Sequence, residues 1–117
     1  MKCNQVMSEE PVYCFPFDFI AKVARLMKQE NVSLIPIIDA EESKKLVGVV
    51  SDRDLVLKVL AEERDPATIK VEEVMARKAI TCRPDDDLQK ALDVMRQNQL
   101  RRVPIVDEEN RMVGIIA

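Results

Sequence analysis

Hydrophobic and polar residues alternate along this chain in a pattern that predicts the same short series of elements twice. In each series a brief β-prone run leads into a stretch with apolar residues three or four positions apart, which is typical of an amphipathic helix. Two apolar runs joined by polar residues follow, and they predict a pair of strands. In the first series the predicted elements are 12–15, 20–27, 34–38 and 46–50; in the second they are 80–82, 88–95, 103–106 and 112–116.

The amino acids themselves also repeat at a constant spacing. Three matches lie 68 residues apart: Val6-Met7 with Val74-Met75, Cys14-x-Pro16 with Cys82-x-Pro84, and the run IPIID at 35–39 with VPIVD at 103–107. Two extra residues in the first copy then bring Gly48 and Gly114 to an offset of 66. The chain therefore contains two copies of one unit.

The two copies differ at their ends. After Ser51 the first copy predicts a second helix from Asp52 to about Glu63, with Leu55, Val56, Val59 and Leu60 on its apolar side. The second copy stops at Ala117, which aligns with Ser51. We therefore expect the apolar surface of the second copy to be uncovered, and to be hidden by dimerisation or by a natural chain that continues past Ala117.

These elements predict an α/β (α+β) fold of two pseudo-symmetric β-α-β-β-α repeats packed sheet to sheet, the second lacking its last helix. Packing the two sheets together would bury faces that one copy alone leaves bare, and would create clefts between the copies. The predicted boundaries are residues 1–64 for the first repeat, 65–73 for a linker and 74–117 for the truncated second repeat.

Composition narrows the possible functions. A net charge of −3 and an aromatic content of 3% do not favour a nucleic-acid partner. No apolar stretch near the start is long enough for a membrane span. Because histidine is absent, the chain cannot form a Ser-His-Asp triad or a typical zinc site. Three cysteines without a C-x-x-C motif favour a reducing compartment, so we expect a cytoplasmic protein.

Both copies resemble a known family over almost their whole length. The stretches VMSEEPVYCFPFDFIAKVARLMKQENVSLIPIIDAEESKKLVGVVSDRDL and VMARKAITCRPDDDLQKALDVMRQNQLRRVPIVDEENRMVGII are each similar to a cystathionine-β-synthase (CBS) domain. Two such domains in tandem form a Bateman module. The resemblance implies a regulatory homodimer rather than an enzyme, with no catalytic or metal-binding residues and no required cofactor. It also implies that AMP, ADP, ATP or S-adenosylmethionine binds between the repeats.

The stretch Ser51-x-x-Asp54 has two interpretations. From local sequence alone it is a capping box, in which Ser51 and Asp54 satisfy free amides at a helix start. The resemblance implies that Asp54 binds the ribose hydroxyls of an adenosyl ligand and that Ser51 lies near its phosphate. The two roles are compatible. Because Ala117 replaces the serine in the second copy, we expect the competent site to be the one beside Asp54.

Five further residues are candidates for the same site. Arg101 and Arg102 precede a predicted strand and either clamp phosphate or are solvated. Arg53 either reaches phosphate or a partner subunit, or is simply exposed. Val49 and, by resemblance, Ile80 would form the apolar wall for adenine, although both are equally well explained as core residues.

Two other interpretations remain open at this stage. The main alternative is a ligand-free module that joins protomers or binds a partner protein. An enzyme has little support, because no nucleophile lies beside a base in the sequence. The matching positions of Cys14 and Cys82 fit buried apolar use better than a redox pair.

Overall fold

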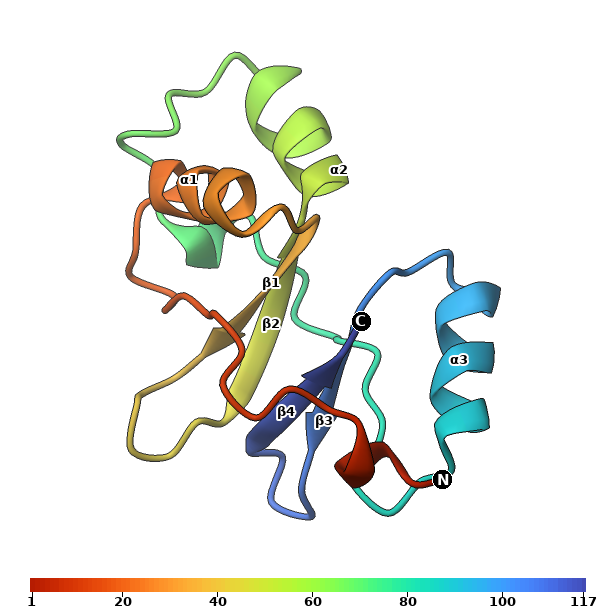
Figure 1. Cartoon of the computed structure of the whole chain (residues 1–117). Coiled ribbons are helices and arrows are strands. Elements are labelled where there is room, and N and C mark those ends of the chain that lie inside the picture. The colour runs from red at the N-terminus through yellow and green to blue at the C-terminus, as the bar shows by residue number, and fades with distance from the viewer.

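A computed structural model describes all 117 residues and shows two halves, each with a two-stranded sheet and its own helices (Figure 1). The first half contains helix α1, strands β1 and β2, and a second helical segment made of α2 and the π-helical turns η2. The second half contains α3, β3 and β4. Two single 3₁₀ turns, η1 and η3, lie near residue 3 and residue 71. The bounds are η1 Cys3–Gln5, α1 Ile20–Glu30, β1 Leu34–Ile38, β2 Leu46–Ser51, α2 Asp52–Leu55, η2 Val56–Leu60, η3 Val71–Glu73, α3 Leu88–Gln97, β3 Val103–Val106 and β4 Met112–Ile116.

The four long strands confirm the prediction from the apolar runs. Strand β1 pairs antiparallel with β2, and β3 pairs antiparallel with β4. Both hairpins have a register shift at the same place, just before Ile38 and Val106. Asp39 and Asp107 then hold the turns, because their carboxylates accept backbone N–H bonds from Lys45 and Arg111 at 3.0 and 2.8 Å. The two copies therefore fold alike down to the turn.

The short β-prone runs are less regular than predicted. Neither 12–15 nor 80–82 forms a strand. Each makes a single parallel bridge instead, Cys14 to Ile37 and Cys82 to Ile105. The physical reason is that each run contacts the outer edge of its hairpin at only one residue before a proline, at position 16 or 84, removes a backbone donor.

Each sheet is extended on its other edge by a segment that leads into the opposite copy. Ser8 pairs with Ile115 of β4, and Ala76 pairs with Val49 of β2. Glycine allows this close approach: a Cβ on Gly48 would lie 2.8 Å from the Ala76 carbonyl oxygen, and one on Gly114 would lie 2.8 Å from that of Ser8. The repeated glycines are therefore explained by the crossing of the two segments.

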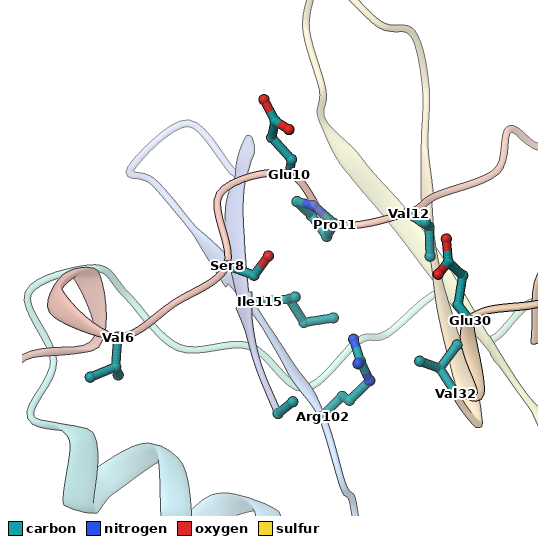
Figure 2. Close-up of a pocket in the computed structure, with 10 residues that line it drawn as sticks. Val6, Ser8, Glu10, Pro11, Val12, Glu30, Val32, Arg102 and Ile115 are labelled. Atoms are coloured by element: carbon teal, nitrogen blue, oxygen red, sulfur yellow. The ribbon is translucent and has the colours of Figure 1, made fainter.

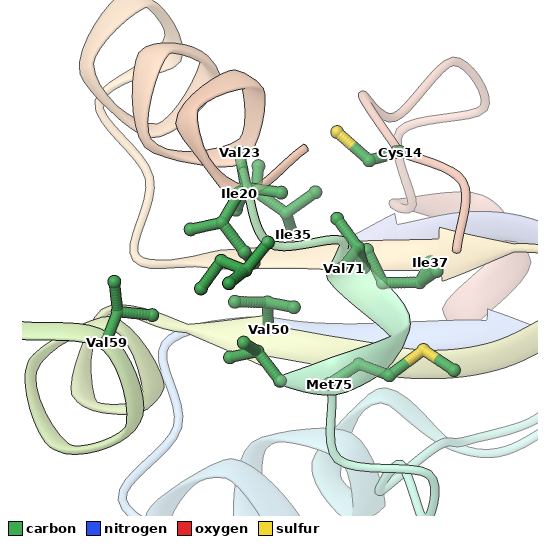
Figure 3. Close-up of a cluster of buried hydrophobic side chains, with 11 residues drawn as sticks. Cys14, Ile20, Val23, Ile35, Ile37, Val50, Val59, Val71 and Met75 are labelled. Carbon is green, nitrogen blue, oxygen red and sulfur yellow. The ribbon is translucent and has the colours of Figure 1, made fainter. Parts of the chain in front are cut away.

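The core of the first half lies between the sheet and its helices (Figure 3). Ile20 and Val23 of α1 pack onto Ile35 of β1 and Val50 of β2, and all four are buried. The predicted second helix was too long at its C-terminal end, since regular helical structure ends at Leu60. The prediction of its apolar side was also partly wrong. Val59 is fully buried and Leu55 is half-buried, whereas Val56 and Leu60 are exposed.

The two sheets meet at the turn ends of their hairpins. Ile38 and Leu46 form one buried cluster with Val106 and Met112, so each hairpin contributes two residues. Backbone bonds join the hairpins as well: Leu46 N donates to Asn110 O and Met112 N to Lys44 O. This contact is the sheet-to-sheet packing expected from the repeat.

The second half is covered more fully than predicted. Val103, Ile105 and Ile116 are buried in a cluster that includes Cys3 and is flanked by Met7. The expectation of an uncovered apolar sheet was wrong, because the N-terminal segment covers this sheet; it runs beside β4 to the start of α3 (Figure 1). The predicted linker also contributes to a core, because Val71 is buried in the core of the first half. The predicted domain boundaries remain predictions.

All three cysteines are buried free thiols. Cys14 belongs to the core of the first half, while Cys82 belongs to that of the second. Burial raises the pKa of the Cys14 thiol to about 11, with a smaller contribution from the nearby charge of Asp18. These thiols act as small apolar side chains, which is the interpretation that the sequence favoured.

Candidate functional site

The start of α2 is a capping box, as the sequence predicted. Ser51 Oγ accepts a hydrogen bond from the Asp54 N–H at 3.1 Å, and Asp54 Oδ2 accepts one from the Ser51 N–H at 2.9 Å. The two residues thus satisfy each other's backbone donors where β2 turns into helix. This arrangement fixes both side chains at the boundary between the first half and its neighbour.

The second oxygen of Asp54 has a partner that the sequence analysis missed. Lys58, one turn further along, places Nζ 3.2 Å from Asp54 Oδ1. The Asp54 side chain is only 17% exposed, whereas that of Lys58 is 46% exposed. The carboxylate is therefore held by the cap on one oxygen and by an ammonium group on the other.

A cleft of about 400 Å³ lies beside this helix start and is shared by the two halves. We refer to it as the Ser51 cleft. Two groups of residues line it: Ser33, Leu34, Ser51, Asp52 and Arg53 from the first half, and Asn98, Gln99, Leu100, Arg101 and Arg102 from the second. Four predicted residues therefore meet here, Ser51, Arg53, Arg101 and Arg102. Asp54 does not itself line the cleft.

The walls of the Ser51 cleft carry more positive than negative charge. Arg53, Arg101 and Arg102 contribute three guanidinium groups, and none of the three makes an ion pair or a side-chain hydrogen bond in the structure. Asp52 is the only carboxylate in the lining, and it accepts a hydrogen bond from the Arg53 N–H at 2.8 Å. Unpaired guanidinium groups in a cleft suit an anionic ligand, above all a phosphate.

The two residues predicted to contact adenine lie outside the lining of this cleft. Val49 is half-buried, and its backbone pairs with Ala76 through two hydrogen bonds of 2.9 and 3.0 Å. Ile80 is 39% exposed, on the segment that leads from Ala76 into the second half. Both residues are therefore accessible, but the structure does not bring them into the Ser51 cleft.

A second cleft, of about 360 Å³, is related to the first by the repeat (Figure 2). We refer to it as the Ala117 cleft. Val32 lines it and is the counterpart of Leu100 in the Ser51 cleft at the offset of 68. Val12 and Ile115 also line it, but their counterparts Ile80 and Val49 lie outside the Ser51 cleft, so the two clefts match only in part. Ala117 takes the place of Ser51. The lining is completed by Val6, Ser8, Glu10, Pro11, Glu30 and Arg102.

The two clefts differ in charge. Glu10 and Glu30 line the Ala117 cleft together with Arg102, whose side chain projects between Ile115 and Val32 in Figure 2. Arg102 also lines the Ser51 cleft, and it lines a pocket of about 460 Å³ between the two, next to Lys28 and Arg101. The positive charge is thus concentrated on the Ser51 side.

Sequence reasoning did not select Ser33, Leu34, Asp52 or the turn 98–100 of the cleft lining, nor Lys58 beside it. Ser33 could have been found, because it is the counterpart of Arg101 at the offset of 68. The turn and Lys58 gave no such signal. No three His, Cys, Asp or Glu side chains converge where they could hold a metal ion. None of the helices is long and apolar enough to cross a lipid bilayer.

Two pseudo-symmetric halves that share clefts at their boundary define a paired-domain module. The family model of the CBS domain matches residues 3–61 and 71–117. The chain therefore belongs to the CBS domain family and contains two of its domains.

Known relatives share this arrangement. The chain is 42% identical over 114 residues to the CBS domain-containing protein YhcV of Bacillus subtilis, covering 97% of this chain and 78% of that protein. It is 32% identical to the inosine-5'-monophosphate dehydrogenase of Methanocaldococcus jannaschii, where 98% of this chain matches only 22% of the enzyme. The solved CBS domain pair of protein MJ0100, in complex with 5-methylthioadenosine and S-adenosyl-L-methionine, matches with a TM-score of 0.83 and 28% identity, covering 100% of this chain and 89% of that chain.

Proposed function

We propose that this chain is a non-catalytic regulatory module that binds an adenosyl ligand between its two CBS domains, beside Ser51 and Asp54. The observation that carries the proposal is the Ser51 cleft itself: three unpaired guanidinium groups from both halves surround a helix start that holds a carboxylate. Its volume of about 400 Å³ falls within the range of small-ligand pockets in proteins.

Each predicted residue has a role in this proposal. Asp54 lies just outside the lining of the Ser51 cleft, and it accepts hydrogen bonds from the ribose hydroxyls of a ligand that extends past the helix start. The Ser51 hydroxyl, which still has a proton to donate, lies near the phosphate. Arg53, Arg101 and Arg102 bind the phosphate oxygens. A ligand long enough to extend beyond the cleft would contact Val49 and Ile80 with its adenine ring. Because Arg102 lines both clefts, a ligand in one also affects the other.

The ligand class rests on two arguments. The CBS pair of MJ0100, 28% identical to this chain, binds two adenosyl compounds. The excess of guanidinium groups in the Ser51 cleft favours a ligand with phosphate, so AMP, ADP and ATP rank before S-adenosylmethionine. A regulatory role fits the small share of the dehydrogenase that this chain matches, because the rest of that enzyme lies outside the module.

Titration calorimetry with AMP, ADP, ATP, S-adenosylmethionine and NAD tests the proposal. Asp54→Asn retains an oxygen for the helix cap but loses the charge that holds the diol. A charged hydrogen-bond acceptor is worth about 1.5–3 kcal/mol, so removing it should weaken binding about 10- to 150-fold. Asp86→Asn is the matched control. Asp86 accepts the Arg83 N–H at 2.8 Å shortly before α3, and none of its chain neighbours lines either cleft, whereas Asp54 directly follows Ser51, Asp52 and Arg53 of the Ser51 cleft.

The outcome that contradicts the proposal is clear. If the folded protein releases no heat with any of the five compounds, the module does not bind an adenosyl ligand under those conditions and the alternative function takes its place. A loss of affinity in Asp86→Asn equal to that in Asp54→Asn would show that the effect is structural rather than local to the site.

The alternative function, a module that joins protomers, is favoured by one specific surface. Val56, Leu57 and Leu60 form an exposed apolar face on the second helical segment, and Leu60 is 67% exposed. We propose that this face is buried in a homodimer, with or without ligand. Sedimentation equilibrium tests this idea: Leu60→Glu should yield monomers, whereas a wild-type protein that is already monomeric at high concentration would contradict it.

A further inference from the structure

Lys58 makes two contacts that connect the candidate site to the crossing between the two halves. Its Nζ lies 3.2 Å from Asp54 Oδ1 and donates a hydrogen bond of 3.0 Å to the backbone carbonyl of Val74. Lys58 lies in the π-helical turns Val56–Leu60, a type of backbone often found at functional sites. One flexible side chain thus bridges the acid of the site and a distant part of the backbone.

The Val74 end of this bridge lies where the chain passes into the second half. Val74 is buried, and two residues later Ala76 pairs with Val49 of β2. Lys58 is the hydrogen-bond donor that the structure provides for the Val74 carbonyl. A buried carbonyl left without a donor is destabilising, so this contact has a structural role of its own. A functional role must therefore be measured separately from stability.

The contacts of Asp54 limit how many lone pairs its carboxylate has free for hydrogen bonds from a ligand. Oδ2 already accepts the Ser51 N–H, and Oδ1 faces the Lys58 ammonium. A ribose diol presents two hydroxyl donors, and a carboxylate binds them best when lone pairs on its oxygens are free. The ammonium group therefore competes with the diol for Oδ1, the oxygen that the helix cap does not use.

We propose that Lys58 is a specificity-determining residue that sets how strongly Asp54 distinguishes a ribose with both hydroxyls from one without them. The inference rests on the proposed function of the Ser51 and Asp54 site. Lys58 holds the carboxylate in the empty site and yields part of its contact when the diol binds. Removing its charge frees Oδ1 and strengthens the preference for the diol.

The experiment measures the dissociation constants of ATP and of 2′,3′-dideoxy-ATP by calorimetry and takes their ratio. Both probes carry the same triphosphate, so the general loss of positive charge cancels in the ratio. Lys58→Gln keeps an amide donor for the Val74 carbonyl but lacks the charge. Exposed ion pairs are weak, so the expected effect is small. In Lys58→Gln, the dissociation constant of 2′,3′-dideoxy-ATP divided by that of ATP should be about two- to fivefold higher than in the wild type.

Two further variants separate the proposed role from a structural one. Lys58→Arg keeps the charge and should bring the ratio back toward the wild-type value. Lys90→Gln removes an i,i+4 ion pair of the same kind, with Asp86 in the second half, and should not change the ratio. If Lys58→Gln proves unstable, the wild-type ratio at rising ionic strength replaces it. Salt screens the pair between Lys58 and Asp54, so the ratio should rise, while screening of the shared triphosphate cancels.

Each result has a definite meaning. A higher ratio in Lys58→Gln but not in Lys90→Gln supports the proposal. An unchanged or lower ratio, with ATP still bound by the wild type, overturns the role of Lys58 and leaves the proposed function standing. The absence of heat from ATP in the wild type overturns the role of Lys58, and it overturns the proposed function as well only if AMP, ADP, S-adenosylmethionine and NAD also give no heat.

Discussion

Replacing Gly48 or Gly114 with alanine tests the close crossing of the segments that lead into each repeat. A Cβ on Gly48 would lie 2.8 Å from the Ala76 oxygen and 2.9 Å from Met75 Sδ. A Cβ on Gly114 would lie 2.8 Å from the Ser8 oxygen and 2.6 Å from Met7 Sδ. Real Cβ atoms do not come this close, so something must move.

The two kinds of contact differ in how easily they yield. The sulfur atoms lie on flexible side chains, but both oxygens are fixed: Ala76 O accepts the Val49 N–H at 3.0 Å, and Ser8 O accepts the Ile115 N–H at 3.0 Å. Relieving the overlap must disturb these bonds. Overpacking of this kind costs about 1–3 kcal/mol. For a chain of this size, we expect Tm to fall by about 4–12 °C.

Urea denaturation and thermal melting measure the effect in each variant, and Met75→Ala provides the control. Since the fixed oxygen remains, Met75→Ala should not restore the stability of Gly48→Ala. Full restoration would show that only the sulfur contact matters. A Gly48→Ala protein that melts within about 1 °C of the wild type would refute the close approach altogether.

Two further predictions concern stability. Cys14 should make the protein less stable at alkaline pH. The pKa of its thiol is about 11 in the folded protein, above the ordinary value of 9.0. The stability that the neutral buried thiol contributes is therefore fully present below pH 9 and is lost as the pH rises toward 11. Urea melts from pH 8 to 11 should show a loss on the order of 2 kcal/mol that shrinks in Cys14→Ala; an equal loss in both proteins would contradict the assignment. Asn110 has a positive φ of 63° and donates a bond of 2.9 Å to the Leu46 carbonyl. Asn110→Ala should therefore lower stability by about 1–2 kcal/mol and Asn110→Gly by less, because glycine tolerates the backbone; equal losses in thermal melts would exclude a backbone contribution.

Strands β1 and β3 were predictable because each is a continuous run of apolar residues. The segments Leu34–Ile38 and Val103–Val106 are buried along their whole length, so their pattern carries a clear signal. The second helix was predicted less well. Its apolar residues outnumber those that the sheet can cover, and the sequence does not show that Leu60 points away from the core.

The site was predictable only in part, for a related reason. The capping box needs just four consecutive residues, so Ser51 and Asp54 could be identified locally. The turn at 98–100 reaches the Ser51 cleft only after the two halves have docked. Likewise, nothing in the sequence around Lys58 shows that the Val74 carbonyl lies beside it. Residues brought together by docking leave no periodic signal in the chain.

The pairing of the N-terminal segment with β4 affects how the protein folds as it is synthesised. Cys3 N donates to the Asp86 carbonyl, and Ser8 exchanges two backbone bonds with Ile115. During synthesis, residues 3–8 must therefore wait without their partners until residue 115 has been translated. Because closure of such distant contacts is slow, we expect the first half to acquire its core early, with residues 1–8 locking into place as the final step.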